Sequence, residues 1–157
     1  MYKSILLPTD GSRLSEEAAR AGIALARALG ARVTALHVVT ESADVGLDAW
    51  AHARPDFSGK LATTLGSRGE VYVENVREAA RLSGVPCECR VSRGPSPHAG
   101  IIEEAKQGEH DLIVMASHGR DEAEEGTFGS ETLKVLKLGD TPVLVHHDRR
   151  RPAVRAG

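Results

Sequence analysis

The feature that most constrains the fold of this chain is the alternation of apolar runs of strand length with segments of helical spacing. Polar residues are almost absent from the runs, as expected for strands that a parallel sheet buries on both faces. Between the runs, apolar and small residues recur with the period of an amphipathic helix. The runs are 4–7, 33–39, 112–116 and 142–145, and the helical segments are 14–29, 61–82, 101–108 and 130–138.

A fifth strand is predicted at 85–91, where Cys87 and Cys89 alternate with Glu88 and Arg90. Charged residues on one side of a strand indicate an exposed face and therefore an edge strand. Strands that alternate with helices favour a parallel sheet with right-handed crossovers. We predict an α/β, doubly wound, three-layer domain with about four helices and a five-stranded parallel sheet of order 3-2-1-4-5. Residues 41–59 have no clean period and are predicted to form a long crossover loop, with a helical turn near 48–53.

Composition and charge indicate an ordinary water-soluble domain. The 157 residues carry a net charge of -2 and are 41% hydrophobic, so nothing favours a nucleic-acid or membrane partner. The opening reaches Pro8 too soon for a signal peptide, and no apolar run approaches the ~20 residues of a membrane span. We expect a cytoplasmic protein.

Cys87 and Cys89 lie two apart on one strand face and are predicted to be buried, reduced thiols rather than a disulfide or metal site.

The stretch 111–132 predicts an anion site. An apolar strand ends abruptly at Ala116, and a loop leads to Gly129 and Ser130, which is placed like the N-cap of a helix. A strand, a loop and a helix N-terminus bring free backbone N–H groups and the positive end of a helix dipole to the carboxyl edge of a sheet. In a doubly wound fold the turn after the first strand should face this loop, which would bring Asp10 next to Gly119.

This stretch resembles the nucleotide loop of the universal stress protein family, Gly-x2-Gly-x9-Gly-Ser/Thr, with Ala116 at the place of the first glycine and Gly119, Gly129 and Ser130 at the others. The opening Pro8-Thr9-Asp10-Gly11-Ser12 and the pair His37-Val38 are also similar to that family. The resemblance covers roughly residues 2–146. It implies an adenine nucleotide alpha hydrolase-like fold over 1–147, followed by a basic flexible tail over 148–157.

The same resemblance implies a site for an adenine nucleotide, ATP or AMP. Asp10 would accept a hydrogen bond from a ribose hydroxyl. An Asp-Gly-Ser sequence is also common in turns, so Asp10 could instead be a residue that caps its own turn. Pro8, Thr9 and Val38 would line the adenine pocket. Ribose and phosphates would be surrounded by Met115, Ala116, Gly119, Arg120, Gly129, Ser130, Glu131 and Thr132.

Acidic residues in the loop oppose this ligand. Asp121, Glu122, Glu124 and Glu125 face a single Arg120, and each close like-charge pair costs on the order of 1 kcal/mol at a protein surface. Three solutions remain open: the carboxylates point into water, Mg²⁺ neutralises the site, or the ligand is AMP or another less charged nucleotide.

Catalysis is not predicted. His118 lies in the loop, but no nucleophile or second base accompanies it and no Gly-Lys-Ser/Thr phosphate motif occurs, so it is interpreted as a backbone-bonding turn residue. His146 and His147 are neighbours at the end of a strand. Their side chains are expected to point to opposite faces, so they do not form a metal site. No catalytic or metal residue is therefore assigned.

The last predicted strand would lie at a sheet edge, where unpaired backbone groups favour a partner. Members of the resembling family pair this strand across a two-fold axis, which implies a homodimer through Thr141, Val143, Leu144 and Val145. The tail Arg149–Arg151 is interpreted as solvated, and no nucleic-acid partner is expected.

The leading hypothesis is an adenine-nucleotide-binding stress-response protein that acts through nucleotide- or partner-dependent regulation, with an unknown regulatory protein as partner. One alternative is a nucleotide-free homodimeric interaction module that has lost the phosphate site. Another is a slow, Mg²⁺-dependent nucleotide hydrolase that uses Asp10 and His118.

Overall fold

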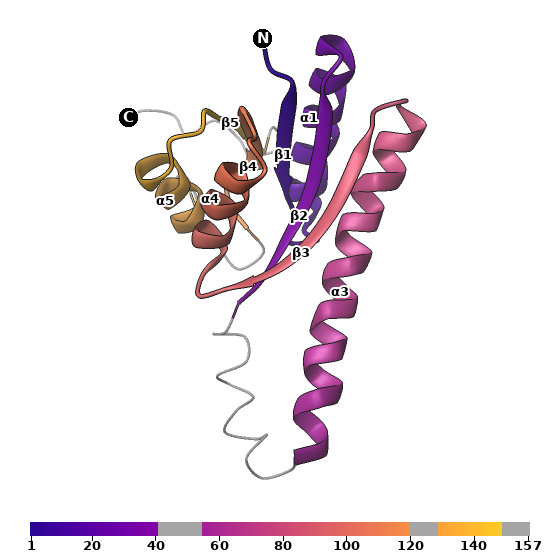
Figure 1. Cartoon of the computed structure of the whole chain (residues 1–157), viewed down its shortest axis with the longest axis vertical. Coiled ribbons are helices and arrows are strands. Elements are labelled where there is room, and N and C mark those ends of the chain that lie inside the picture. Colours follow the sequence, from indigo (N-terminus) through magenta and orange to yellow (C-terminus); the bar gives the residue numbers. More distant parts are fainter. Residues whose placement is uncertain (41–54, 120–128, 149–157) are drawn as a thin grey trace, which may run out of the picture.

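The computed structural model describes residues 1–40, 55–119 and 129–148, with the backbone alone over 55–67. Helices and strands alternate along the chain (Figure 1). In order they are β1 (Ser4–Pro8), α1 (Arg13–Leu29), β2 (Arg32–Thr40), α3 (Pro55–Leu82), β3 (Cys87–Gly94), α4 (Pro97–Gln107), β4 (Leu112–Ala116), α5 (Ser130–Leu138) and β5 (Val143–His146).

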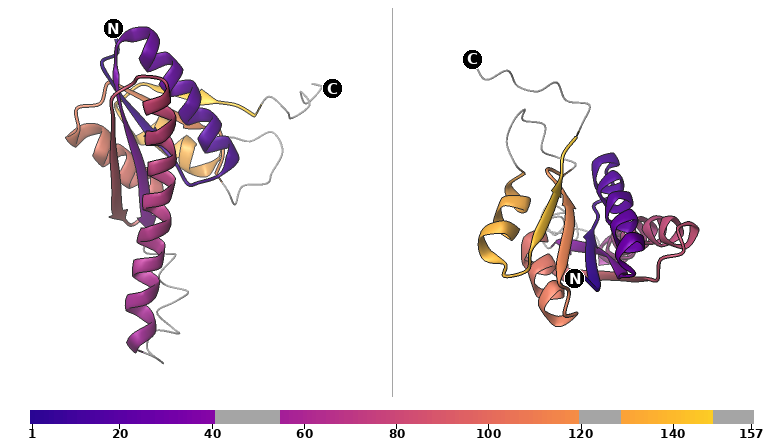
Figure 2. Two further views of the ribbon diagram at one scale, coloured as in Figure 1. Left: turned by 90° about the vertical axis from the view of Figure 1, so that its right-hand side faces the viewer. Right: turned by 90° about the horizontal axis from the view of Figure 1, so that it is seen from above.

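The strands form one parallel five-stranded sheet of order β3-β2-β1-β4-β5, which confirms the predicted doubly wound fold. Helices α1 and α3 cover one face and α4 and α5 cover the other (Figure 2). Because side chains alternate along a strand, Ile5 and Leu7 enter the core under α1 and α3, whereas Leu6 enters the core under α4. Both β3 and β5 are edge strands, as predicted.

Local sequence signals explain how α1 begins, ends and packs. The Ser12 side chain accepts a hydrogen bond from the Ser15 amide, and Gly30 ends the helix in the left-handed conformation with φ 65°. Gly22 lies so close to Leu7 and Val114 that a Cβ atom there would collide with the Leu7 side chain. The middle of α1 therefore lies directly on the central strands.

Four predicted boundaries were wrong, each beside a proline. Helix α3 begins at Pro55, inside the segment 41–59 that we predicted to be a loop, because proline is well tolerated in the first turn of a helix. The third strand is Cys87–Gly94 rather than 85–91, since it begins only after Pro86. Arg93 and Gly94 are paired to β2 instead of forming a turn. Strand β1 includes Pro8. The predicted helical turn near 48–53 lies outside the described residues.

Cys87 and Cys89 are free thiols on the inner face of β3, but they are half-buried rather than fully buried. Burial, helped by the neighbouring Cys89, raises the pKa of the Cys87 thiol to about 11. A thiol with this pKa is protonated at neutral pH and unreactive.

Within the described ranges, no cluster of three His, Cys, Asp or Glu side chains could hold a metal ion. No helix among those residues has the length and apolar character needed to span a bilayer.

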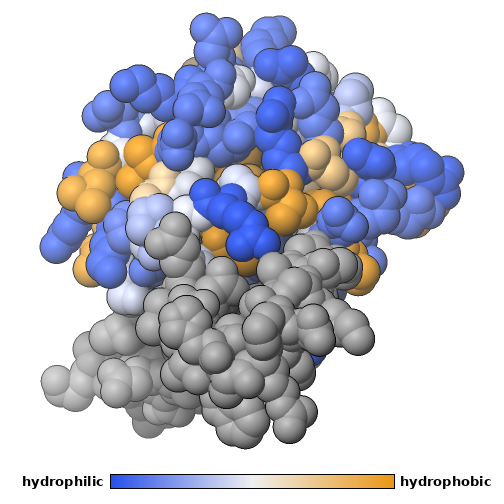
Figure 3. Space-filling model, turned by 60° about the horizontal axis from the view of Figure 1, so that its bottom comes forward, coloured by the Kyte–Doolittle hydropathy of each residue, from blue (hydrophilic) through white to orange (hydrophobic). Residues whose placement is uncertain are grey.

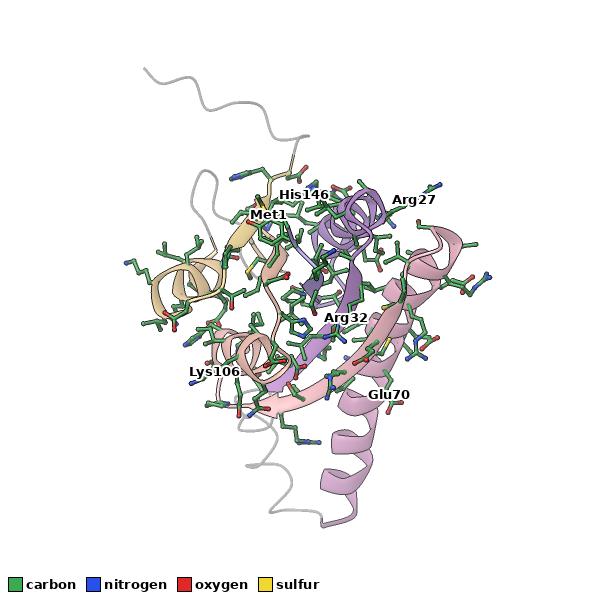
Figure 4. All side chains as sticks on the ribbon, turned by 45° about the horizontal axis from the view of Figure 1, so that its top comes forward. Met1, Arg27, Arg32, Glu70, Lys106 and His146 are labelled. Atoms are coloured by element: carbon green, nitrogen blue, oxygen red, sulfur yellow. The ribbon has the colours of Figure 1, made fainter. Side chains whose placement is uncertain are left out.

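A polar network lies beneath α4, at the edge of the sheet opposite the carboxyl ends of the strands. His110 is buried, and its Nδ1 lies 2.8 Å from the Ser4 hydroxyl, which also accepts from Arg32 at 3.3 Å. Its Nε2 is 3.7 Å from Glu104, which in turn pairs with Arg90 at 3.1 Å. Figure 4 brings this edge forward and shows Arg32 between α4 and β3. Burial lowers the pKa of His110, Arg32 and Arg90 act in the same direction, and Glu104 opposes them.

This network should make the protein less stable in mild acid. Because the pKa of His110 is lower in the folded state, the unfolded chain binds more protons as the pH falls below about 6.5, and the free energy of unfolding decreases. We expect urea denaturation between about pH 7 and about pH 5 to show a smaller loss of stability in His110→Gln than in the unmodified protein. Equal losses in the two proteins would contradict this role.

Candidate ligand-binding crevice

A cavity of about 540 Å³ opens at the carboxyl ends of the central strands. From β1 the sheet continues to β2 and β3 on one side and to β4 and β5 on the other, so the cavity lies where the direction of the strand order reverses. Figure 3 turns the lower side of Figure 1 forward and shows apolar side chains among hydrophilic ones on the described part of this face. Apolar walls with a few polar groups are typical of small-molecule sites. The lining residues of the cavity include Pro8, Thr9, Asp10, Leu36, His37, Val38, Arg68, Tyr72, Pro97, Ile101, Met115, Ala116, His118, Gly119, Glu131 and Thr132.

The turn after β1 forms one wall and is held by its own hydrogen bonds. The Thr9 amide donates to the Leu36 carbonyl at 2.8 Å, which fixes the turn to β2. Asp10 Oδ1 accepts from the Ser12 amide at 2.9 Å, and Gly11 adopts φ 76°, where glycine is favoured. Asp10 is therefore a turn cap and also a lining residue, so the two interpretations of this residue are compatible.

The turn after β4 faces the first one. A Cβ atom at Gly119 would lie 2.9 Å from Asp10 Oδ2, so the two turns meet as the doubly wound fold predicted. The Gly129 amide donates to the Ser117 carbonyl at 2.6 Å, and the Thr132 hydroxyl donates to the Ala116 carbonyl at 2.9 Å. These two bonds fasten the start of α5 to the end of β4.

The predicted cap of α5 was wrong by one residue. Gly129 is the N-cap, without a side-chain hydrogen bond, and Ser130 is the first helical residue. Because the Gly129 amide is used by Ser117, it is already satisfied before any ligand arrives.

Glu131 joins the two helices on one side of the crevice. Its Oε2 accepts from the His98 amide at 2.7 Å and from the His98 ring at 2.8 Å, so a carboxylate from α5 caps the first turn of α4. Burial raises the pKa of the Glu131 carboxyl, but the hydrogen bonds and charge of His98 outweigh burial and hold its pKa below the usual value. The side chain therefore brings a negative charge to the cavity wall at neutral pH.

Sequence reasoning missed the wall formed by α3. The ring of Tyr72 meets that of His37 edge to face, with centroids 5.2 Å apart and an interplanar angle of 77°. His37 Nδ1 donates to the Thr9 carbonyl at 2.8 Å, so both aromatic rings are tied to the first turn. The available signals were Gly11 and Gly69, since a Cβ at Gly11 would collide with Tyr72 and one at Gly69 would lie 2.6 Å from His37.

His118 has the local role that the sequence predicted. Its Nδ1 donates to the Gly119 carbonyl at 3.3 Å, while its Nε2 is buried and has no hydrogen-bond partner among the described residues. Neither ring nitrogen of His118 is hydrogen-bonded to a Ser, Cys or carboxylate of the described residues.

Most of the residues predicted to bind nucleotide lie together around the cavity, although their roles as ligands stay a prediction. Gly129 and Ser130 lie at the start of α5 but are not lining residues, and Arg120 and the acidic residues 121–125 lie outside the described residues. The predicted residues that do line the cavity are Pro8, Thr9, Asp10, Val38, Met115, Ala116, Gly119, Glu131 and Thr132.

The fold and the crevice together define a doubly wound α/β protein with a ligand-sized cavity at the reversal point of its sheet. A model of the universal stress protein family matches residues 1–147. Universal stress protein MJ0531 of Methanocaldococcus jannaschii is 36% identical over 146 residues, covering 92% of this chain and 82% of that protein. Universal stress protein YxiE of Bacillus subtilis is 31% identical over 150 residues, covering 92% and 99%. The chain belongs to the universal stress protein family.

Solved structures agree with this assignment. That of MJ0577 from Methanocaldococcus jannaschii superposes with a TM-score of 0.82 at 29% identity, covering 96% of this chain and 99% of that one. More distant universal stress proteins include one solved with cAMP, one from Archaeoglobus fulgidus with dAMP and one from Arabidopsis thaliana with AMP. Their TM-scores are 0.63, 0.57 and 0.65 at 20%, 18% and 16% identity, each covering at least 92% of this chain, and this likeness shows the shared fold alone.

Proposed function

We propose that this chain binds an adenine nucleotide, ATP or AMP, in the crevice and acts in the stress response by nucleotide- or partner-dependent regulation. The observation that carries the proposal is the meeting of the first and fourth turns, with Asp10 beside Gly119, over a cavity of about 540 Å³. Relatives of the same fold that were solved with cAMP, dAMP and AMP support this class of ligand. We place the protein in the cytoplasm.

The chemistry of the walls supports this orientation of the ligand. Val38 and Pro8 offer apolar contact for a purine base, and the Asp10 carboxylate can accept a hydrogen bond from a ribose hydroxyl. Phosphate would then lie toward Gly119 and the first turn of α5, where helix N-terminal amides attract anions. If Mg²⁺ accompanied the nucleotide, the Asp10 and Glu131 carboxylates would be the side chains near it, and the ion would neutralise negative charge on this side of the crevice.

We propose binding rather than turnover, since His118 lacks a companion nucleophile in the described residues. Two observations favour the rival function, a nucleotide-free interaction module. The Gly129 amide is already bonded to Ser117, and Glu131 places negative charge beside the phosphate position. The test must therefore include a ligand without phosphate.

The proposed function is tested on the purified protein without added ligand. Denaturation should release an adenine nucleotide, which mass spectrometry identifies. Calorimetric titration of the protein freed of nucleotide should then show saturable binding of AMP and of ATP, the latter measured with and without Mg²⁺. Adenosine is titrated in parallel to separate recognition of the base and ribose from recognition of phosphate. If neither AMP nor ATP gives heat at about millimolar concentration, the nucleotide proposal is wrong and the interaction module becomes the better hypothesis.

We further propose that β5 pairs with its copy in a homodimer. Strand β5 lies at the edge of the sheet, and its Val143, Val145 and Leu144 are all partly exposed, Leu144 by 42%. A Val143→Glu variant should therefore sediment as a monomer, because a carboxylate buried in this interface would be unpaired. Leu82→Glu, at the exposed end of α3, serves as the control. An unchanged sedimentation mass for Val143→Glu would disprove this interface.

A further inference from the structure

Helix α3 brings two side chains to the cavity one turn apart, Arg68 and Tyr72. Residues four apart share one face of a helix. The position of this face is fixed, because the Tyr72 ring packs edge to face on His37 and His37 is bonded to the Thr9 carbonyl at 2.8 Å. Arg68 lies one turn nearer the start of α3, the end that extends beyond the carboxyl edge of the sheet (Figures 1 and 2).

The residue next to Arg68 explains why α3 approaches the crevice so closely. A Cβ atom at Gly69 would lie 2.6 Å from the His37 ring and 3.3 Å from Val91. Only a residue without a side chain lets the helix backbone lie this near β2 and β3. The base of the Arg68 side chain is thereby held at the rim of the cavity.

The charges around the cavity give Arg68 a distinct place. Among the described lining residues, Asp10 and Glu131 carry carboxylates, and Arg68 is the one side chain that is always positively charged. Other arginines of the β3 side of the molecule pair with carboxylates, Arg81 with Glu78 at 2.7 Å and Arg90 with Glu104 at 3.1 Å. Over the described ranges no carboxylate pairs with Arg68, which is exposed.

We infer that Arg68 binds the phosphate of the nucleotide and makes the cavity prefer a phosphorylated ligand to a nucleoside. The inference rests on the proposed function and adds a residue from α3, outside the loop between β4 and α5. The Asp10 and Glu131 carboxylates repel a phosphate, and Arg68 supplies a positive charge from another wall that opposes this repulsion. The planar guanidinium of Arg68 can donate two parallel hydrogen bonds to phosphate oxygens, which the ammonium group of a lysine cannot.

The test compares AMP with adenosine in calorimetric titrations of three variants. Arg68→Gln should weaken AMP binding about fivefold to tenfold and change adenosine binding by less than about twofold. Arg68→Lys keeps the charge and should recover part of the AMP affinity. Arg77→Gln is the matched control, since Arg77 is also exposed on α3 but pairs with Glu74 at 3.4 Å, and it should bind both ligands as the unmodified protein does.

Two results would contradict the role of Arg68 without contradicting the proposed function. One is AMP affinity that Arg68→Gln leaves unchanged, and the other is an equal loss for AMP and adenosine, which would indicate a packing role. In either case the unmodified protein would still bind AMP, so the proposed function would survive. If the unmodified protein binds neither ligand, the proposed function and this inference fall together.

Discussion

A Gly119→Val variant is expected to lose AMP binding by about a hundredfold or more while it remains folded. The Cβ atom of the new side chain would lie 2.9 Å from Asp10 Oδ2, at the place where the first and fourth turns meet. Its methyl groups would then occupy the space in which the ribose and phosphate are proposed to lie. Gly119 is exposed, so the change removes no core contact. Titration calorimetry measures the affinity, and thermal unfolding confirms that the variant is folded.

Gly139→Val is the matched control for this experiment. A Cβ atom at Gly139 would also lie 2.9 Å from an oxygen, the Val135 carbonyl, but this site is at the end of α5 and away from the cavity. The control variant should therefore bind AMP normally even if its stability falls. AMP affinity in Gly119→Val within about threefold of the unmodified protein would show that the ligand does not lie between these turns.

Leu36→Ala is expected to lower the free energy of unfolding by about 3 kcal/mol. The Leu36 side chain is 0% exposed and packs in the core under α4 with Leu6 and Ile113. It also lines the cavity, so its truncation would both remove buried apolar surface and enlarge an existing space. Urea denaturation followed by circular dichroism measures the loss.

Leu82→Ala is the control for this prediction, because the Leu82 side chain at the end of α3 is 73% exposed and the same truncation should cost less than about 0.5 kcal/mol. A loss below about 1 kcal/mol in Leu36→Ala would mean that the core closes over the site when this side chain is shortened.

The positions of the strands in the sequence could be predicted because each buried strand is an apolar run and the helices between them have helical spacing. Leu112–Ala116 and Arg32–Thr40 were located closely for this reason. Boundaries next to Pro55 and Pro86 were missed because proline can either begin an element or precede it, and the sequence alone does not decide which.

The meeting of Asp10 and Gly119 was also predictable, since both follow strands that must end at the same edge of a parallel sheet. The contribution of α3 was not. Tyr72 and Arg68 lie on a long helix whose register against β2 depends on the close approach of Gly69 to His37, a tertiary contact. The Glu131–His98 bond was missed for the same reason, because it joins two helices through side chains 33 residues apart.

The central position of β1 has a consequence for how the molecule forms. Its neighbour β4 comes late in the chain, and the Ser4 amide is bonded to Asp111 across a sequence separation of 107 residues. During synthesis the first strand emerges early but has to wait for this partner until most of the polypeptide has been made. Such a distant pairing slows folding relative to a helical bundle of equal length. Until then one edge of the first strand is without its native neighbour, so nascent chains are the form of this protein in greatest need of protection from aggregation.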